Sequence, residues 1–173
     1  MCKSILFAAL LSSALIGCSA PDSQRVSADE ITEIALNEVP MDVRTVVMTT
    51  SPEFKMVEVV KKLRDGRTYF DVEGELPNGD EIEFDVLITV EGPQIVEIQR
   101  DLLLEDVPQP IRDVLDTGNT DKLKVVRVIE SRQADGDTII YEFFVADHPS
   151  DPRFEVSVSG DNPPKLLKTR WKH

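Results

Sequence analysis

The stretch "VPMDVRTVV" at residues 39–47 returns as "VPQPIRDVL" at residues 107–115. Matching positions are 68 residues apart, as in Val39 and Val107 (107 − 39 = 68). A proline suits the first turn of a helix, where its missing N–H costs nothing, and the apolar residues after it fall one turn apart on one face. The two stretches therefore predict two short amphipathic helices, each opening a copy of the same unit.

The segments after each helix correspond as well. "KMVEVVK" from Lys55 matches "KVVRVIE" from Lys124, and the Asp-Gly pair at 65–66 matches the pair at 135–136. A period of about 70 residues is too long for a solenoid repeat, so we expect two copies of one small domain.

Each copy shows four strand-like segments after its helix, separated by turn signals such as Asn78-Gly79. One helix can cover the apolar face of a four-stranded sheet. The predicted fold class is therefore α+β, with two tandem repeats that each pack one helix on a four-stranded antiparallel sheet. The expected strands are 55–63, 67–76, 80–90 and 95–100 in the first copy, and 123–131, 137–146, 153–159 and 165–171 in the second.

The strand 80–90 alternates strictly between apolar and acidic residues. Its acids Glu81, Glu83 and Asp85, with Glu73 and Glu75 across the hairpin, would share one face. We interpret that face as solvated, with Ca²⁺ binding as the alternative. Tyr69 and Phe144 fall on the same side as acids, opposite to the main apolar face, which predicts that this second face is covered by another part of the chain or by a partner.

The first apolar run, residues 5–16, follows Lys3 and is too short to span a membrane. It ends in Leu15-Ile16-Gly17-Cys18, which resembles the lipobox of bacterial lipoproteins. The resemblance implies cleavage before Cys18, a diacylglycerol on its sulfur and a further acyl chain such as palmitate on its amine. Serine rather than aspartate at position 19 favours the periplasmic face of the outer membrane. The alternative is an ordinary cleaved signal with a chance cysteine.

These segments divide the chain into a signal peptide (1–17), a lipidated tether (18–27), a first repeat (28–103) and a second repeat (104–173). An S-x-x-E capping box at Ser27–Glu30 predicts an extra helix at the start of the first repeat, ending near Asn37.

Both repeats resemble the PepSY-like domain family in their Val-Pro helix starts and in strands such as "YFDVE" and "IEFDVLITVEGPQIVEI". The tandem arrangement is similar to beta-lactamase inhibitory protein, which has two helix-and-four-strand repeats. PepSY-like units occur in peptidase propeptides, so the resemblance implies a secreted binding module that restrains or regulates a peptidase. The "SGDNPPKLL" stretch departs from the acidic-Gly turn of the family.

Cleavage after residue 17 removes Lys3 alone among the charged residues and leaves 18 basic and 32 acidic residues, so 18 − 32 gives a charge of −14. This charge argues against nucleic acid as a partner. The last nine residues, "KLLKTRWKH", are basic. They could pair with the chain's own carboxylates, or Lys168, Arg170 and Trp171 could contact a partner, since Trp and Arg are enriched at interfaces.

Catalytic motifs are missing from the sequence: it has no H-E-x-x-H, G-x-S-x-G or P-loop, and its two histidines are His148 in a turn and His173 at the end. We therefore expect no catalytic residue, cofactor or metal ligand. The predicted function is a lipid-anchored envelope protein that binds another envelope protein, such as a peptidase that it inhibits. An envelope assembly scaffold is the alternative, and a Ca²⁺-binding protein or hydrolase is a third.

Overall fold

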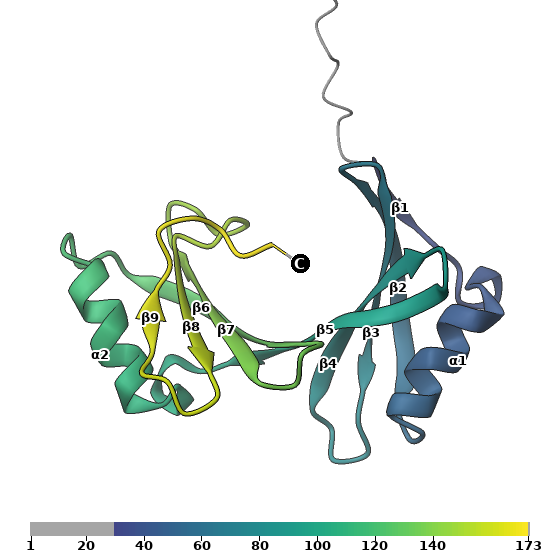
Figure 1. Cartoon of the computed structure of the whole chain (residues 1–173), viewed down its shortest axis with the longest axis horizontal. Helices are drawn as coiled ribbons and strands as arrows, with labels where there is room; N and C mark the ends of the chain where they lie inside the picture. Colours follow the sequence, from purple (N-terminus) through teal and green to yellow (C-terminus); the bar gives the residue numbers. More distant parts are fainter. Residues whose placement is uncertain (1–29, 173) are drawn as a thin grey trace, which may run out of the picture.

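A computed structural model describes residues 30–172. Within this range the chain forms one nine-stranded antiparallel sheet whose strand order follows the sequence, with two α-helices and two short 3-10 helices (Figure 1). No helix in residues 30–172 is long and apolar enough to cross a membrane. The strands are β1 (Glu30–Glu33), β2 (Lys55–Arg64), β3 (Arg67–Glu75), β4 (Glu81–Thr89), β5 (Gly92–Leu102), β6 (Val125–Gln133), β7 (Thr138–Val145), β8 (Phe154–Ser159) and β9 (Lys165–Leu166); the helices are η1 (Leu36–Glu38), α1 (Met41–Thr50), η2 (Leu104–Asp106) and α2 (Gln109–Gly118).

The prediction of an α+β fold with two separate four-stranded sheets is wrong, because the structure is mainly β and all nine strands belong to one sheet. Strand β5 is the reason. Its residues 92–99 pair with β4, and its residues 97–102 pair with β6. A sheet edge at β5 would leave backbone N–H and C=O groups unpaired, and pairing with β6 satisfies them.

The ends of the described chain also differ from the prediction. Residues 30–33 form the edge strand β1 against β2, where a helix up to Asn37 was expected. A helix that short is marginal, whereas a strand gains a ready-made partner at the sheet edge. The strand expected at 165–171 is only the two residues of β9, because the chain then turns to place Trp171 against side chains of the sheet.

Both α-helices begin directly after a proline, as the repeated Val-Pro motif predicted. Each buries two apolar side chains one turn apart, Val43 and Val47 in α1 and Ile111 and Leu115 in α2. These residues centre two hydrophobic clusters on one face of the sheet, which we call the outer face. The first cluster is completed by Val39, Phe54, Val59, Phe70, Val72, Phe84 and Val86, and the second by Val107, Val128, Tyr141, Phe143 and Val156.

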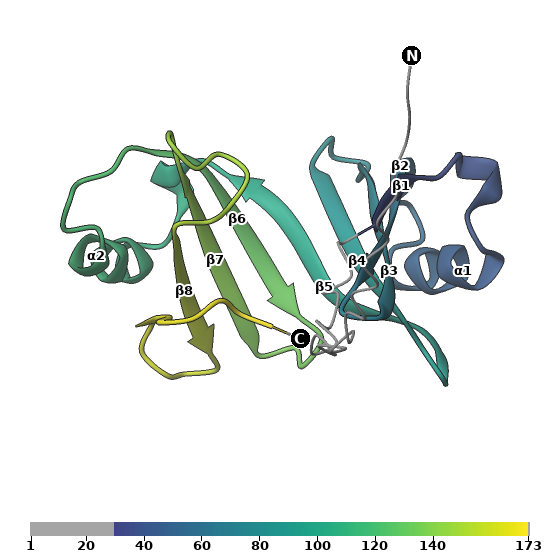
Figure 2. The same cartoon turned by 90° about the horizontal axis from the view of Figure 1, so that it is seen from above.

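The helices lie at opposite ends of the outer face, and the sheet bends between them (Figures 1 and 2). The other face, which carries no helix, is concave, and we call it the concave face. The pairing register places on it a set of mostly polar side chains: Lys62, Tyr69, Asp71, Glu73, Glu83, Asp85, Leu87, Glu97, Gln99, Ser131, Gln133, Ile140, Glu142, Phe144 and Glu155.

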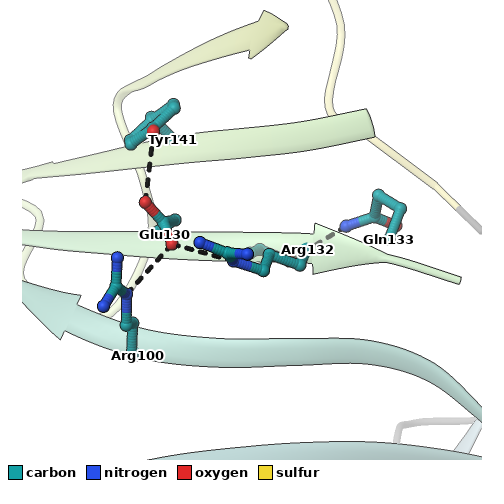
Figure 3. A network of polar contacts seen from close by, with 6 residues as sticks. Arg100, Glu130, Arg132, Gln133 and Tyr141 are labelled. Atoms are coloured by element: carbon teal, nitrogen blue, oxygen red, sulfur yellow. Dashed lines mark hydrogen bonds and ion pairs between the residues drawn. The ribbon is translucent and has the colours of Figure 1, made fainter. Parts of the chain in front are cut away.

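A polar network fills the outer face between the two hydrophobic clusters (Figure 3). The buried Glu130 carboxylate accepts hydrogen bonds from Arg100 Nε at 2.9 Å, Arg132 Nε at 3.1 Å and Tyr141 Oη at 3.1 Å. Burial opposes ionisation of Glu130, but these hydrogen bonds and the arginine charges hold its pKa below its usual value. The ionised Glu130 on β6 therefore links its strand to β5 through Arg100 and to β7 through Tyr141.

One continuous sheet predicts that damage to the first cluster destabilises the second half. Phe84 is fully buried and meets the Phe54 ring edge-on, with 5.0 Å between centroids. Phe84→Ala should lower the free energy of unfolding by about 3–5 kcal/mol. Fluorescence of Trp171, the chain's one tryptophan, should then report the same lowered midpoint as far-UV circular dichroism.

The matched control is Val90→Ala, because Val90 is fully exposed and its truncation should leave both midpoints unchanged. A Trp171 transition that stays at the wild-type midpoint in Phe84→Ala, beside a second transition in circular dichroism, would mean that the two halves unfold independently.

Candidate functional site

A row of acidic side chains crosses the middle of the concave face. Asp71 on β3 lies directly opposite Asp85 on β4, Asp85 lies opposite Glu97 on β5, and Glu97 lies opposite Gln133 on β6. All four residues are less than 9% exposed. Like charges directly opposite one another destabilise a sheet, so the carboxylates of this row repel one another when they are ionised.

A β-bulge puts Glu97 into this row. The pairing of β4 with β5 shifts by one residue between Asp85 and Val86. As a result Ile95 and Ile98 both pack against the first hydrophobic cluster, although they are three residues apart. Bulges re-aim side chains in this way, and here the extra residue turns Glu97 toward the concave face.

The members of the row differ in how their oxygens are satisfied. Glu97 accepts hydrogen bonds from Ser131 Oγ, from Gln133 Nε2 at 2.7 Å and from Gln99 Nε2 at 3.0 Å. Asp71 forms an ion pair with Lys62. The Oδ1 atom of Asp85 is buried and has no hydrogen-bond partner. Buried polar atoms in proteins are nearly always satisfied, so this oxygen points to something further in the site.

Burial and mutual repulsion raise the pKa of the acids on this face. Burial, with the nearby Asp85 charge, raises the pKa of Glu83 to about 7. Burial and Glu97 raise the pKa of Asp85 to about 6, and burial raises that of Glu97. Burial, Glu97 and Glu155 raise the pKa of Glu142 to about 7. The concave face therefore holds several carboxyl groups that exchange protons near neutral pH.

The interpretation of the hairpin acids as a solvated face is wrong for Asp85, which is buried, and for the half-buried Glu83. It is right for Glu81, which is exposed near the hairpin turn. The curvature of the sheet explains the difference, since side chains near the middle of a concave face shield one another from water. The sequence reasoning missed Glu97 and Glu142 as members of this group; their acidity was visible, but their faces depend on the bulge and on the joining of the two halves.

The predicted partner-binding residues Lys168 and Arg170 lie together after β9. Both line a pocket of about 270 Å³ with His148, Asp151 and other residues of the segment before β8. The Arg170 guanidinium is already engaged, since it pairs with Asp151 Oδ1 at 2.5 Å and donates to the Pro152 carbonyl at 2.8 Å. This geometry matches the alternative in which the basic end pairs with the chain's own carboxylates.

Trp171 lies apart from that pocket, over the concave face. Its backbone N–H donates to Glu155 Oε2 at 2.7 Å, and its indole N–H donates to Gln133 Oε1 at 2.7 Å. The segment after β9 therefore runs over the concave side of the sheet (Figure 1), and its Trp171 contacts Gln133, the last residue of the row. Trp171 is 37% exposed, so part of its ring remains accessible. The predicted lipidation residue, Cys18, lies outside the described residues.

Comparison with known proteins gives little beyond this geometry. No protein-family model and no curated protein sequence matches the chain, so the PepSY-like resemblance stays a prediction. One solved structure with a detectable likeness is a predicted periplasmic protein of the DUF2874 family from Bacteroides vulgatus, 19% identical over 82% of this chain and 97% of that one, with a TM-score of 0.32. A likeness this weak carries no argument about the function or the location of this chain.

The raised pKa values predict that the protein loses stability as the pH rises. A carboxyl group whose pKa is raised by folding binds its proton more tightly in the folded than in the unfolded chain. For Glu83, this proton binding adds fully to the free energy of unfolding below the unfolded pKa of about 4.5. The added stability is lost as the pH rises through the folded pKa of about 7. Between pH 4.5 and pH 8, ionisation of this group alone should lower the free energy of unfolding by on the order of 3 kcal/mol. Urea unfolding at each pH measures this change.

Glu83→Gln should flatten this pH dependence and make the protein more stable than wild type at pH 8, with little change at pH 4.5. Glu81→Gln is the matched control, because Glu81 lies two residues away on the same strand and is exposed. A wild-type stability that rises from pH 5 to pH 8, or equal slopes for wild type and Glu83→Gln, would contradict the assignment.

Proposed function

We propose that the protein is a non-catalytic binding module of the bacterial cell envelope, and that its concave face holds a positively charged segment of another envelope protein. The observation that carries the proposal is the charge of that face. By the pairing register, strands β2 to β8 place eleven carboxyl groups and five basic side chains on it. The carboxyl groups are those of Glu58, Asp71, Glu73, Glu75, Glu81, Glu83, Asp85, Glu97, Asp101, Glu142 and Glu155, and the basic residues are Lys55, Lys62, Arg64, Arg67 and Arg127.

The apolar side chains of the same face support electrostatic rather than hydrophobic recognition. Tyr69, Ile140 and Phe144 are each less than 6% exposed. Arg127 covers the Phe144 ring at 5.5 Å, and Arg67 lies 5.4 Å from the centre of the Tyr69 ring. A partner would therefore meet the exposed or half-buried carboxyl groups of Glu73, Glu83 and Glu142, beside the accessible part of the Trp171 ring. Such complementarity favours fast, salt-sensitive association.

The predicted lipid anchor gives this binding a location. A chain held through Cys18 by a tether of residues 18–27 would keep the concave face close to the membrane, on the periplasmic face of the outer membrane in this proposal. The resemblance to PepSY-like domains supports a secreted peptidase as the partner, whose activity the module would restrain. An assembly scaffold would use the same face to hold a different envelope protein.

Photo-crosslinking in the source cell tests the proposal. A benzoylphenylalanine at Gln99 would stand on the concave face, whereas the same residue at the exposed Met41 would stand on the helix side. We expect an envelope protein to crosslink from position 99 and not from position 41. Identification by mass spectrometry then separates a peptidase, which the purified module should inhibit, from a component of an assembly complex.

Charge variants sharpen the same experiment. Glu142→Gln combined with Glu73→Gln should reduce crosslinking from position 99 by roughly tenfold or more, because each removes a carboxylate from the face. The matched control, Glu38→Gln, changes an exposed acid in η1 and should have no effect. Crosslinks that form only from position 41, or that survive the double variant at 0.5 M NaCl, would refute binding through the acidic face.

A further inference from the structure

Three carboxyl groups of the concave face converge closely enough to share one ion. Oxygen atoms of Asp71, Glu83 and Asp85 all lie within 4.8 Å of one another. Asp71 and Asp85 are paired across β3 and β4, and Glu83 precedes Asp85 by two residues on the same side of β4. All three side chains therefore project from two hydrogen-bonded strands, which fix their spacing.

A second observation concerns Asp85 alone. This residue is 8% exposed, and its Oδ1 atom is buried without a hydrogen-bond partner. An unsatisfied buried carboxylate oxygen costs considerable free energy, more than a neutral polar atom would. Because Asp85 lies between Asp71 and Glu97 in the row, neighbouring acids cannot satisfy this oxygen while they are ionised. A cation among the carboxylates would.

The charged groups around the three acids do not neutralise them. Lys62, which pairs with Asp71, and Arg127, which lowers the pKa values of Glu73 and Glu83, are the positive groups near the three acids. Glu73, Glu97 and Glu142 add further carboxyl groups on the same face. The negative groups outnumber the positive ones, so a divalent ion would relieve repulsion that Lys62 relieves only in part.

We infer that Asp71, Glu83 and Asp85 form a binding site for a hard divalent cation, with Ca²⁺ as the best match. Ca²⁺ prefers carboxylate oxygens at 2.3–2.6 Å and tolerates irregular geometry, so one ion can contact oxygens up to about 5 Å apart. Mg²⁺ demands a tighter octahedron and sheds its water reluctantly. Water would complete the shell on the open side of the concave face. The site does not depend on the proposed protein partner, and its test needs no partner.

Equilibrium dialysis of the purified full-length protein against ⁴⁵Ca²⁺, at pH 7.5 and constant ionic strength, tests the site directly. We expect one ion per chain with a dissociation constant of about 10⁻⁴–10⁻³ M, the range of extracellular calcium modules. Thermal melting in 5 mM CaCl₂ should show a midpoint several degrees above that in EDTA. NaCl at matched ionic strength should not reproduce this shift, because screening alone acts on the whole acidic surface.

Three variants assign the ion to these residues. Asp85→Asn should weaken Ca²⁺ binding at least tenfold and abolish the melting shift. Glu81→Gln, an exposed acid on the same strand, should bind as wild type does. Lys62→Met removes the ammonium group that competes for Asp71 and should bind Ca²⁺ more tightly than wild type, which a merely nonspecific acidic surface would not single out.

The inference fails if the folded wild-type protein binds no Ca²⁺ up to 10 mM. It also fails if Asp85→Asn, folded by circular dichroism, binds as tightly as wild type. Should Asp85→Asn not fold, Glu83→Gln takes its place with the same expected loss. A crosslinking result against the proposed partner would leave these measurements unaffected, so the two proposals can fail separately.

Discussion

The double pairing of strand β5 is the constraint on which the rest of this structure depends. One end of β5 completes the ladder of β4, and the other end begins the ladder of β6. Two halves that repeat each other in sequence are thereby fixed in one sheet, with a helix at each end of its outer face. Because a β-ladder cannot end in the middle of a sheet without leaving backbone groups unpaired, the junction also sets how the two faces align.

The two faces of the junction carry acids in opposite electrostatic states. On the outer face, the Glu130 carboxylate accepts hydrogen bonds from two arginines and a tyrosine hydroxyl, which keep its pKa low. On the concave face, Asp85 lies between two other acids, and its pKa is raised to about 6 by burial and by Glu97. The first arrangement is a satisfied structural network. The second retains repulsion that the fold tolerates, and such retained strain is typical of sites that bind something.

Much of the local structure was predictable from the sequence. The Val-Pro motifs placed both helix starts, and Asn78-Gly79 with strict alternation placed the β3–β4 hairpin. The structure of the two end segments was not predictable, because it depends on contacts with distant residues rather than on local propensity. Residues 30–33 pair with β2, and the segment after Leu166 is held by hydrogen bonds from Trp171 to Gln133 and Glu155. The acids of the hairpin were visible as candidates, but a solvated face was the wrong interpretation for Asp85.

By itself the sequence determined the repeat, the two amphipathic helices, the positions of strands β2 to β8 and the surplus of acids, because these follow from local periodicity, turn chemistry and composition. Only the tertiary structure decided that the strands form one sheet, that a bulge turns Glu97 to the concave face, and that Asp71, Glu83 and Asp85 converge there. The physical reason is that pairing between distant strands and the curvature of a sheet depend on the register of the whole ladder, and no short stretch of residues encodes that register.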